Sequence, residues 1–216
     1  ILVTNPDLFQ VENINGDTPV SIAAEKNYVK SLELIIKTNS TLLTIEEKGG
    51  WMPIMWILKE GNEMLINQIL DINPGLFFDS TQNGVNLILV AERRNYRTAL
   101  KLIEGHEQKI TELTEKANKG DADSQYDLAH RYHYGKGVNK NLKEATVWYK
   151  KAAGQEHAMA QFYLGGMYFS GLSVAKDYTQ AHHWYEKAAE QEHAMAQLNL
   201  GDMYYYGLSV AHNYTR

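Results

Sequence analysis

The stretch Ala152–Gln161 (Ala-Ala-Gly-Gln-Glu-His-Ala-Met-Ala-Gln) recurs as Ala188–Gln197 (Ala-Ala-Glu-Gln-Glu-His-Ala-Met-Ala-Gln), 36 residues further along the chain. The pair Trp148-Tyr149 recurs at the same spacing as Trp184-Tyr185. Outward from these stretches, the spacing holds over three copies at Leu128, Leu164 and Leu200, at Tyr132, Tyr168 and Tyr204, at Gly135, Gly171 and Gly207, and at Val138, Val174 and Val210. A period of this size predicts stacked helical units, because each unit can bury its apolar face only against a neighbour.

Each 36-residue unit is predicted to contain two helices. In residues 122–134, four side chains fall on one helical face at i, i+3, i+4 and i+7, namely Gln125, Leu128, Ala129 and Tyr132. Gly135-Lys136-Gly137 then ends the helix. Asn141 and Glu144 have the spacing of a capping box, which predicts a second helix over 142–155, and Asp177 and Gln180 repeat this pattern. The expected packing stripe of the second helix is Ala145, Trp148, Tyr149, Ala152 and Ala153.

Residues 107–216 resemble the Sel-one-like repeats, a tetratricopeptide-type family. The resemblance is carried by Ala160-Gln161, Leu164-Gly165, Tyr168, Gly171, Val174, Asp177, Ala181, Trp184-Tyr185 and Ala188-Ala189. Ser173 and Ser209 depart from the family pattern, since each stands where a second loop glycine is usual and Gly137 keeps it. The resemblance implies stacked helix pairs and a role in binding other proteins.

A weaker period of 34 residues marks the first half of the chain, where Gly16, Gly50 and Gly84 share that spacing. The stretch Gly16–Ala24 (Gly-Asp-Thr-Pro-Val-Ser-Ile-Ala-Ala) resembles the ankyrin signature, and the resemblance extends over about residues 5–104. Pro19 suits the first turn of a helix, where its missing N–H is not needed. A turn at Asn27 and a second helix over 28–37, with Leu32, Ile35 and Ile36 facing inward, complete the predicted unit.

The predicted fold is all-α, a continuous helical-repeat solenoid with a right-handed superhelix. Residues 1–106 form the ankyrin-like region, and residues 107–216 form the Sel-one-like region. Ile110, Leu113 and Ala117 indicate a worn second helix over 107–118 at the join. The last repeat stops at Arg216, so its apolar face is expected to fray, to self-associate with a neighbouring molecule, or to be closed in a longer parent protein.

Composition limits the classes of function. The net charge of −5 and a pI near 5.9 argue against nucleic acid and against an anionic membrane surface as partners. The chain has no cysteine, which excludes disulfides and thiolate chemistry and favours an intracellular location, in the cytoplasm of a bacterium or of a host cell. No apolar run is long enough for membrane insertion.

No catalytic residues, cofactor or metal are expected. The sequence contains no phosphate-binding glycine loop, nucleophile elbow or His-Glu-x-x-His motif. His130 and His133, and the adjacent pair His182-His183, lack a third ligand at metal-binding spacing. The 36-residue spacing of His157 and His193 indicates a structural role at the turn between repeats.

The candidate partner-binding residues lie on a stripe that differs between repeats while the core positions agree. The stripe positions are Asp127, Tyr163 and Asn199, then His130, Gly166 and Asp202, then Tyr134, Ser170 and Tyr206. They recur at i, i+3 and i+7 on one side of the first helix, off the core face. Packing does not fix them, so the stripe is interpreted as a binding surface, and the alternative is an ordinary solvated face.

In the first half, the ankyrin resemblance points to the hairpin tips and to the end of each first helix. The residues at these places are Asp17, Trp51, Val85, Glu25, Lys26, Arg93 and Arg94. Trp51 has two interpretations: an exposed aromatic that binds a partner, or a ring that packs beside Trp56.

The function expected from these features is that of a non-catalytic protein–protein interaction scaffold. Both families are similar to adaptor modules, and their combination implies an effector or adaptor of a host-associated bacterium. One alternative is a regulatory or substrate-recruiting arm of a larger enzyme. A second is an inhibitory, immunity-type partner of a toxin or enzyme.

Overall fold

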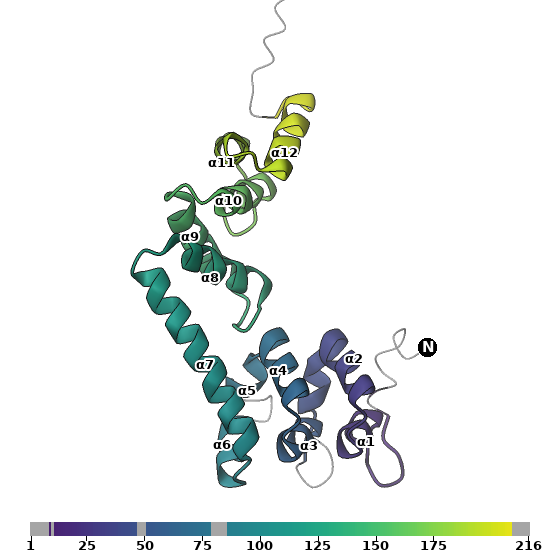
Figure 1. The fold of residues 1–216 in the computed structure, drawn as a ribbon. Helices are drawn as coiled ribbons and strands as arrows, with labels where there is room; N and C mark the ends of the chain where they lie inside the picture. Colours follow the sequence, from purple (N-terminus) through teal and green to yellow (C-terminus); the bar gives the residue numbers. More distant parts are fainter. Residues whose placement is uncertain (1–8, 10, 47–50, 79–85, 209–216) are drawn as a thin grey trace, which may run out of the picture. The chain divides into compact units, whose positions relative to one another are not determined.

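The computed structural model describes residues 9, 11–46, 51–78 and 86–208, and all regular structure in these residues is helical (Figure 1). The predictions for Gly50, Gly84, Val85 and Ser209 fall outside the described residues. The chain folds into two compact units. The first comprises residues 1–109 with 135–139, and the second comprises 110–134 with 140–216.

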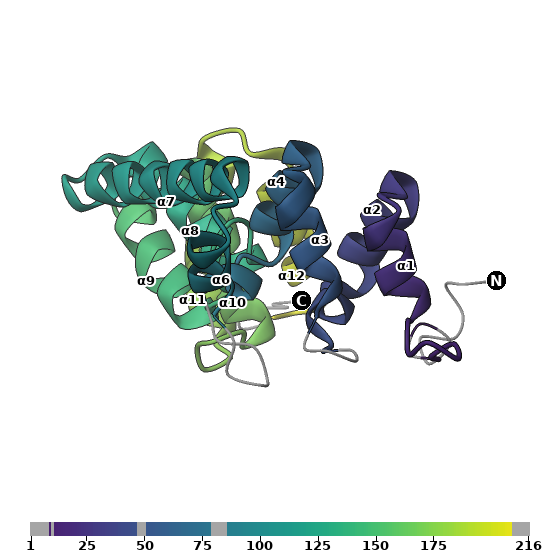
Figure 2. The same ribbon diagram turned by 90° about the horizontal axis from the view of Figure 1, so that it is seen from below.

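The first unit consists of short helices. In chain order they are α1 (Pro19–Glu25), α2 (Val29–Asn39), the 3-10 helix η2 (Ser40–Thr44), α3 (Pro53–Glu60), α4 (Glu63–Ile72), α5 (Gly75–Phe78), α6 (Leu87–Arg93) and the start of α7 (Arg97–Asn118). Helices α1 and α3 pack together, as do α2 and α4, and both views show the pairs side by side (Figures 1 and 2).

The 34-residue period is visible in how these helices begin and turn. Helices α1, α3 and α6 begin 34 residues apart, at Pro19, Pro53 and Leu87, and α2, α4 and α7 keep the same spacing. The residues that turn the chain between paired helices are Asn27, Gly61 and Asn95. Their φ angles are all positive, at 52°, 63° and 58° in that order. Asparagine and glycine are the residues that enter this left-handed region most easily.

Local sequence explains where α1 begins. Thr18 accepts a hydrogen bond from the Ser21 N–H, and the Ser21 hydroxyl accepts one from the Thr18 N–H, so the two form a reciprocal capping box. Pro19 occupies the first turn, as predicted. The apolar residues of the paired helices form one buried cluster, whose largest members include Leu32, Ile54, Leu65, Ile69 and Phe77.

The second unit contains two kinds of helix in alternation, α8 (Ala122–Tyr134), α9 (Leu142–Ala153), α10 (Ala158–Ser170), α11 (Tyr178–Glu190) and α12 (Ala194–Tyr205). The first helices α8, α10 and α12 begin 36 residues apart, and so do the second helices α9 and α11. Each second helix packs against the first helix before it and the first helix after it. The predicted helix pair of 36 residues is therefore confirmed, and the predicted packing stripe of α9 is buried.

Paired glutamines join one repeat to the next. The Gln125 side-chain amide donates to the Ala117 carbonyl at 2.9 Å, and its oxygen accepts from the Gln155 amide at 2.7 Å. Gln161 and Gln191 repeat the contact between the side chains at 2.8 Å. Because Gln125 and Gln161 are buried, these bonds satisfy polar groups that would otherwise be costly to bury.

The loop after the first helix keeps the same left-handed positions in the first two repeats despite the sequence difference noted at Ser173. Ser173 has φ 63°, close to the 69° of Gly137 one repeat earlier. The serine therefore adopts the left-handed backbone of the usual glycine, at some cost in strain. The exchange changes the residue and leaves the loop geometry in place.

The join between the two predicted regions differs from expectation. A separate helix over 107–118 was predicted, and the structure has one helix of 22 residues, α7, from Arg97 to Asn118. Gly105 is the only glycine inside it, and a single helical glycine costs about 1 kcal/mol, which a helix tolerates. The predicted boundary between residues 106 and 107 thus falls inside a helix.

Candidate functional site

The periodic histidines cap the first helices of the second and third repeats. His157 Nδ1 accepts a hydrogen bond from the Ala160 N–H at 3.2 Å, and His193 does the same with Ala196. Each imidazole also stacks on a ring of the preceding repeat, His157 on Tyr126 at 4.6 Å between centroids. These histidines are therefore structural, and they fix the first helices on which the stripe lies.

Six rings of the first two repeats form an aromatic cluster, made of Tyr126, His130, His133, Tyr134, Tyr149 and Tyr163. Three predicted stripe residues meet in it. The His130 ring lies 4.6 Å from the Tyr134 ring and 5.7 Å from the Tyr163 ring. Tyr134 is 49% exposed and forms the outer edge of the cluster.

Tyr163 has a structural role that the sequence did not indicate. Its ring stacks on the fully buried ring of Tyr149, with centroids 5.3 Å apart and planes 5° apart. Burial raises its pKa, and a hydrogen bond to the Tyr134 side chain contributes to the shift. The main role of Tyr163 is therefore to pack beneath the exposed stripe residues, and contact with a partner is secondary.

The cluster also holds a histidine in an apolar environment. His133 Nδ1 is buried, and no hydrogen-bond partner for it is present among the described residues. Burial lowers the pKa of His133, and the positive charge of Lys140 lowers it further. The neutral imidazole is the form that this environment favours.

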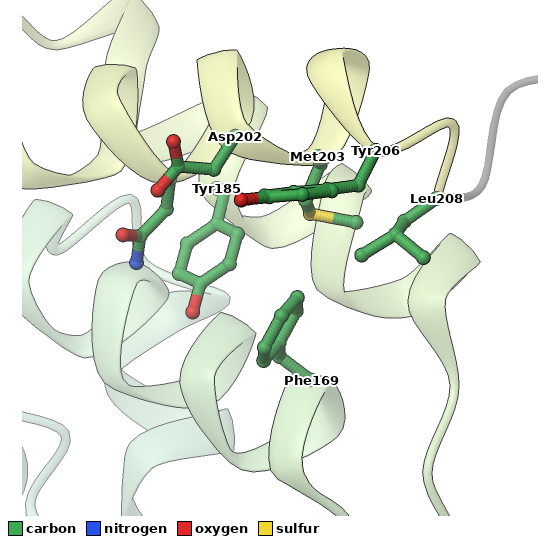
Figure 3. Close-up of a pocket in the computed structure, with 7 residues that line it drawn as sticks. Phe169, Tyr185, Asp202, Met203, Tyr206 and Leu208 are labelled. Carbon is green, nitrogen blue, oxygen red and sulfur yellow. The ribbon is translucent and has the colours of Figure 1, made fainter.

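A pocket of about 190 Å³ lies at the third repeat, between the end of α10, the middle of α11 and α12. Figure 3 shows the rings of Tyr185, Tyr206 and Phe169 around one space, with the Asp202 carboxylate beside it. The lining residues are Phe169, Tyr185, Asn199, Asp202, Met203, Tyr206 and Leu208. We call this space the repeat pocket. It brings together three predicted stripe residues, Asn199, Asp202 and Tyr206.

The repeat pocket exists because of one exchange between repeats. Tyr185 and Asn199 stand 36 residues after Tyr149 and Tyr163, whose rings stack on each other. The asparagine is too short to stack, and it hydrogen-bonds to the Tyr185 side chain instead. Space that a ring fills between the first two repeats is therefore open at the third.

The burial pattern gives the pocket an apolar floor and a polar rim. Met203 is fully buried and Tyr185 is 3% exposed, whereas Tyr206 is 67% exposed and Asp202 is also exposed. Burial raises the pKa of Tyr185, so its hydroxyl stays protonated. Asp202 carries the one charge among the lining residues.

Three stripe residues, Asp127, Gly166 and Ser170, take no part in either group. The Asp127 carboxylate pairs with Arg131 on the same helix at 3.3 Å. The Ser170 hydroxyl donates to the Gly166 carbonyl at 2.8 Å within its own helix. Both interactions are local and are typical of a solvated helix surface.

In the first unit, Trp51 packs on Trp56, with ring centroids 5.1 Å apart, and is only partly exposed. Of the two interpretations of Trp51, the one in which its ring packs beside Trp56 therefore agrees with the structure. Arg94 lies over the same ring at 4.6 Å. Asp17 and both tryptophans line a shallow hollow of about 150 Å³. Arg93 is exposed and lines neither hollow.

Sequence comparison missed Phe169, Tyr185, Met203 and Leu208 as lining residues. Tyr185 matches its counterpart Tyr149, so it was assigned to the core. The sequence did contain an indication. A stripe position that lacks the aromatic ring of the preceding repeat, next to a core tyrosine that is retained, predicts an unfilled space beside that tyrosine. Phe169 and Leu208 carry no comparable signal.

Two absences hold for the part of the chain that the structure describes. No three histidine, aspartate or glutamate side chains converge there as metal ligands would. None of the helices there combines the length and the apolar character that crossing a bilayer requires.

The geometry above defines a helical-repeat protein. The family model described as Sel1 repeat matches the chain three times, at residues 122–157, 158–193 and 194–216, in register with the helix pairs of the second unit. Residues 122–216 are therefore Sel1 repeats. Proteins of this kind are generally non-catalytic and mediate protein–protein interaction.

Two of the solved structures that are similar to this chain are repeat proteins of this kind. A Sel1 repeat protein from Oxalobacter formigenes is 38% identical, over 48% of this chain and 78% of that one, with a TM-score of 0.45. The protein c5321, a protective antigen of uropathogenic Escherichia coli strains that displays an SLR fold, is 22% identical, over 90% of this chain and 38% of that one, with a TM-score of 0.46. No curated protein matches the chain.

Proposed function

We propose that this protein is a non-catalytic scaffold that binds another protein along the stripe on the first helices of its Sel1 repeats. One observation supports this most: stripe residues that differ between repeats gather at the repeat pocket, where an exposed tyrosine and a carboxylate surround an apolar floor. Exposed aromatic residues beside a recess are typical of interface hot spots.

The first unit is proposed to be an ankyrin-like array that precedes the Sel1 repeats in the chain. Its 34-residue helix pairs, the proline at the start of α1 and α3, and the left-handed turn residues support this interpretation. Asp17, Trp51, Arg93 and Arg94 are proposed as a second contact surface, of which Trp51 and Arg94 contact each other. An effector or adaptor role in a host-associated bacterium belongs to the same proposal.

Exposed tyrosines test the proposal best. Tyr134→Ala and Tyr206→Ala remove stripe side chains that are 49% and 67% exposed, so the core should be undisturbed. We expect a partner captured by the wild-type protein to bind at least tenfold more weakly to each variant, a loss of about 1.4 kcal/mol. Capture from lysate with quantitative mass spectrometry identifies the partner, and calorimetry then gives the affinity.

Tyr204→Ala is the matched control, since Tyr204 is 51% exposed on α12, contacts His182 and does not line the pocket. The control should bind as the wild-type protein does. Equal binding by all variants would remove the stripe from the proposal. A substrate turnover that maps to another part of a longer parent protein would favour the alternative of a regulatory arm.

A further inference from the structure

The repeat pocket has the size of one side chain. Its volume of about 190 Å³ is below the 300–1,000 Å³ that is usual for sites that bury whole small molecules. It is also open at one side, where Asp202 and Tyr206 are exposed. A single residue that protrudes from a partner protein fits this space better than a separate ligand does.

The lining restricts the chemistry of that residue. Phe169 and the accessible edge of Tyr185 offer apolar surface that would contact an aliphatic stem, above the fully buried Met203. Asp202 adds a carboxylate at the rim, and no lysine, arginine or histidine is among the lining residues. A positive head group is therefore favoured over a neutral or negative one.

Arginine meets these conditions better than lysine does. Its planar guanidinium can donate two parallel N–H bonds from its edge to a carboxylate while its flat face stacks on an aromatic ring. The repeat pocket offers both, in Asp202 and in the ring of Tyr206, which come from successive turns of α12 on one side of the pocket (Figure 3). The chain itself places a guanidinium in this way on an aromatic ring, where Arg94 lies 4.6 Å from the Trp51 centroid.

We propose that the repeat pocket receives an arginine side chain that protrudes from the partner protein. This inference rests on the proposed scaffold function and adds the chemistry of the residue that is recognised. The overall charge of −5 on the scaffold agrees with a partner that presents basic residues.

The preceding repeat supplies the decisive variant. Asn199→Tyr introduces the residue that Tyr163 provides one repeat earlier, where it stacks on the tyrosine that corresponds to Tyr185. The new ring should fill the pocket without disturbing the helices. Asp202→Asn removes the charge and keeps the shape of the side chain, and thermal unfolding of both variants verifies that they are folded.

The probe is N-acetyl-arginine methylamide, titrated into the protein while backbone NMR signals are recorded. We expect saturable shifts at Asn199, Asp202 and Tyr206 with a dissociation constant on the order of 1–10 mM, as befits one side chain. Asp202→Asn should weaken binding about tenfold, and Asn199→Tyr should abolish it. The citrulline analogue has the same shape and no charge, and it should bind at least tenfold more weakly than arginine.

Several outcomes would overturn the inference: no saturable shift, equal binding of citrulline, or arginine binding that survives Asn199→Tyr. These outcomes leave the scaffold function intact if a partner still depends on Tyr206. A partner that binds wild-type protein and Asp202→Asn equally would likewise overturn the arginine assignment alone. Failure of the scaffold function itself would appear as the absence of any partner that depends on the exposed tyrosines.

Discussion

His133 lies on the last turn of α8 among rings, with Tyr134 stacked at 4.5 Å and Tyr149 at 5.9 Å in an edge arrangement. Its buried Nδ1 has no acceptor nearby in the described part of the chain. A proton on that nitrogen would place an unpaired charge in an apolar environment. The lowered pKa of His133 follows first from this burial.

The consequence at the residue scale is a dependence of stability on pH. Because the folded-state pKa of His133 lies below its ordinary 6.5, the unfolded chain binds the proton more readily. Its contribution is complete above about pH 6.5 and is lost as the pH falls through the lowered pKa. We expect His133→Phe, which copies Phe169 of the next repeat, to lessen the loss of unfolding free energy between about pH 7.5 and about pH 5.

Urea unfolding of the wild-type protein and of His133→Phe at both pH values measures this difference. The contributions of other groups that titrate equally in the two proteins cancel in the comparison. Lys140→Ala should act in the same direction more weakly, because Lys140 is the second cause of the shift. An unchanged pH dependence in His133→Phe would show that the environment of His133 does not favour its neutral form.

At the scale of elements, the histidine caps connect neighbouring repeats. His157 caps α10 through Nδ1 and stacks on Tyr126 of α8, and its Nε2 lies 3.3 Å from the Asp123 carboxylate. His157→Ala removes all three contacts, and we expect it to lower the unfolding free energy by about 1–2 kcal/mol. His157→Asn keeps a capping acceptor and loses the stacked ring, so it should recover roughly half of that loss. Thermal or urea unfolding of the three proteins measures both steps.

The alanine and asparagine variants separate capping from stacking. If His157→Asn were as unstable as His157→Ala, the cap would contribute nothing, and the contacts of the imidazole with Tyr126 and Asp123 would account for the loss. His193 offers an independent repetition, because it makes the same two kinds of contact, to Ala196 and to Phe162.

The helices could be predicted where the sequence repeats itself. The bounds of α8 agree with the predicted 122–134, because its apolar face and the glycine break lie in the local sequence, and Asn141 caps α9 as its spacing predicted. The role of Tyr163 could not be predicted, since its partner Tyr149 lies on another helix and only the fold shows that their rings stack. The unbroken α7 was missed because two repeat patterns meet there with no residue that stops a helix.

The candidate site could be predicted only in part, because some of its lining residues come from other helices. Comparison of aligned positions found Asn199, Asp202 and Tyr206, which come from one helix and vary between repeats. It could not find Phe169, because Phe169 reaches the pocket from the end of a different helix. Positions on one helix face follow from spacing, whereas a pocket between helices depends on tertiary packing.

At the scale of the whole molecule, the two units have separate cores of different character. The first contains large aliphatic residues such as Leu65 and Ile66, and the second contains small alanines between rings such as Tyr149. In repeat proteins, stability is approximately a sum of the repeats and their nearest-neighbour contacts. A destabilising substitution in the core should therefore lower the stability of nearby repeats more than that of distant ones.

Leu164→Ala tests this locality, because Leu164 is fully buried in the second unit. A buried leucine truncated to alanine costs about 2–5 kcal/mol. The indole N–H signals of Trp148 and Trp184 report on that unit, and those of Trp51 and Trp56 report on the first. In a urea titration followed by NMR, we expect the Trp148 and Trp184 transitions to move to clearly lower urea, and the Trp51 and Trp56 transitions to move less. Equal shifts of all four signals would mean that α7, which runs through both units, couples them into one cooperative fold.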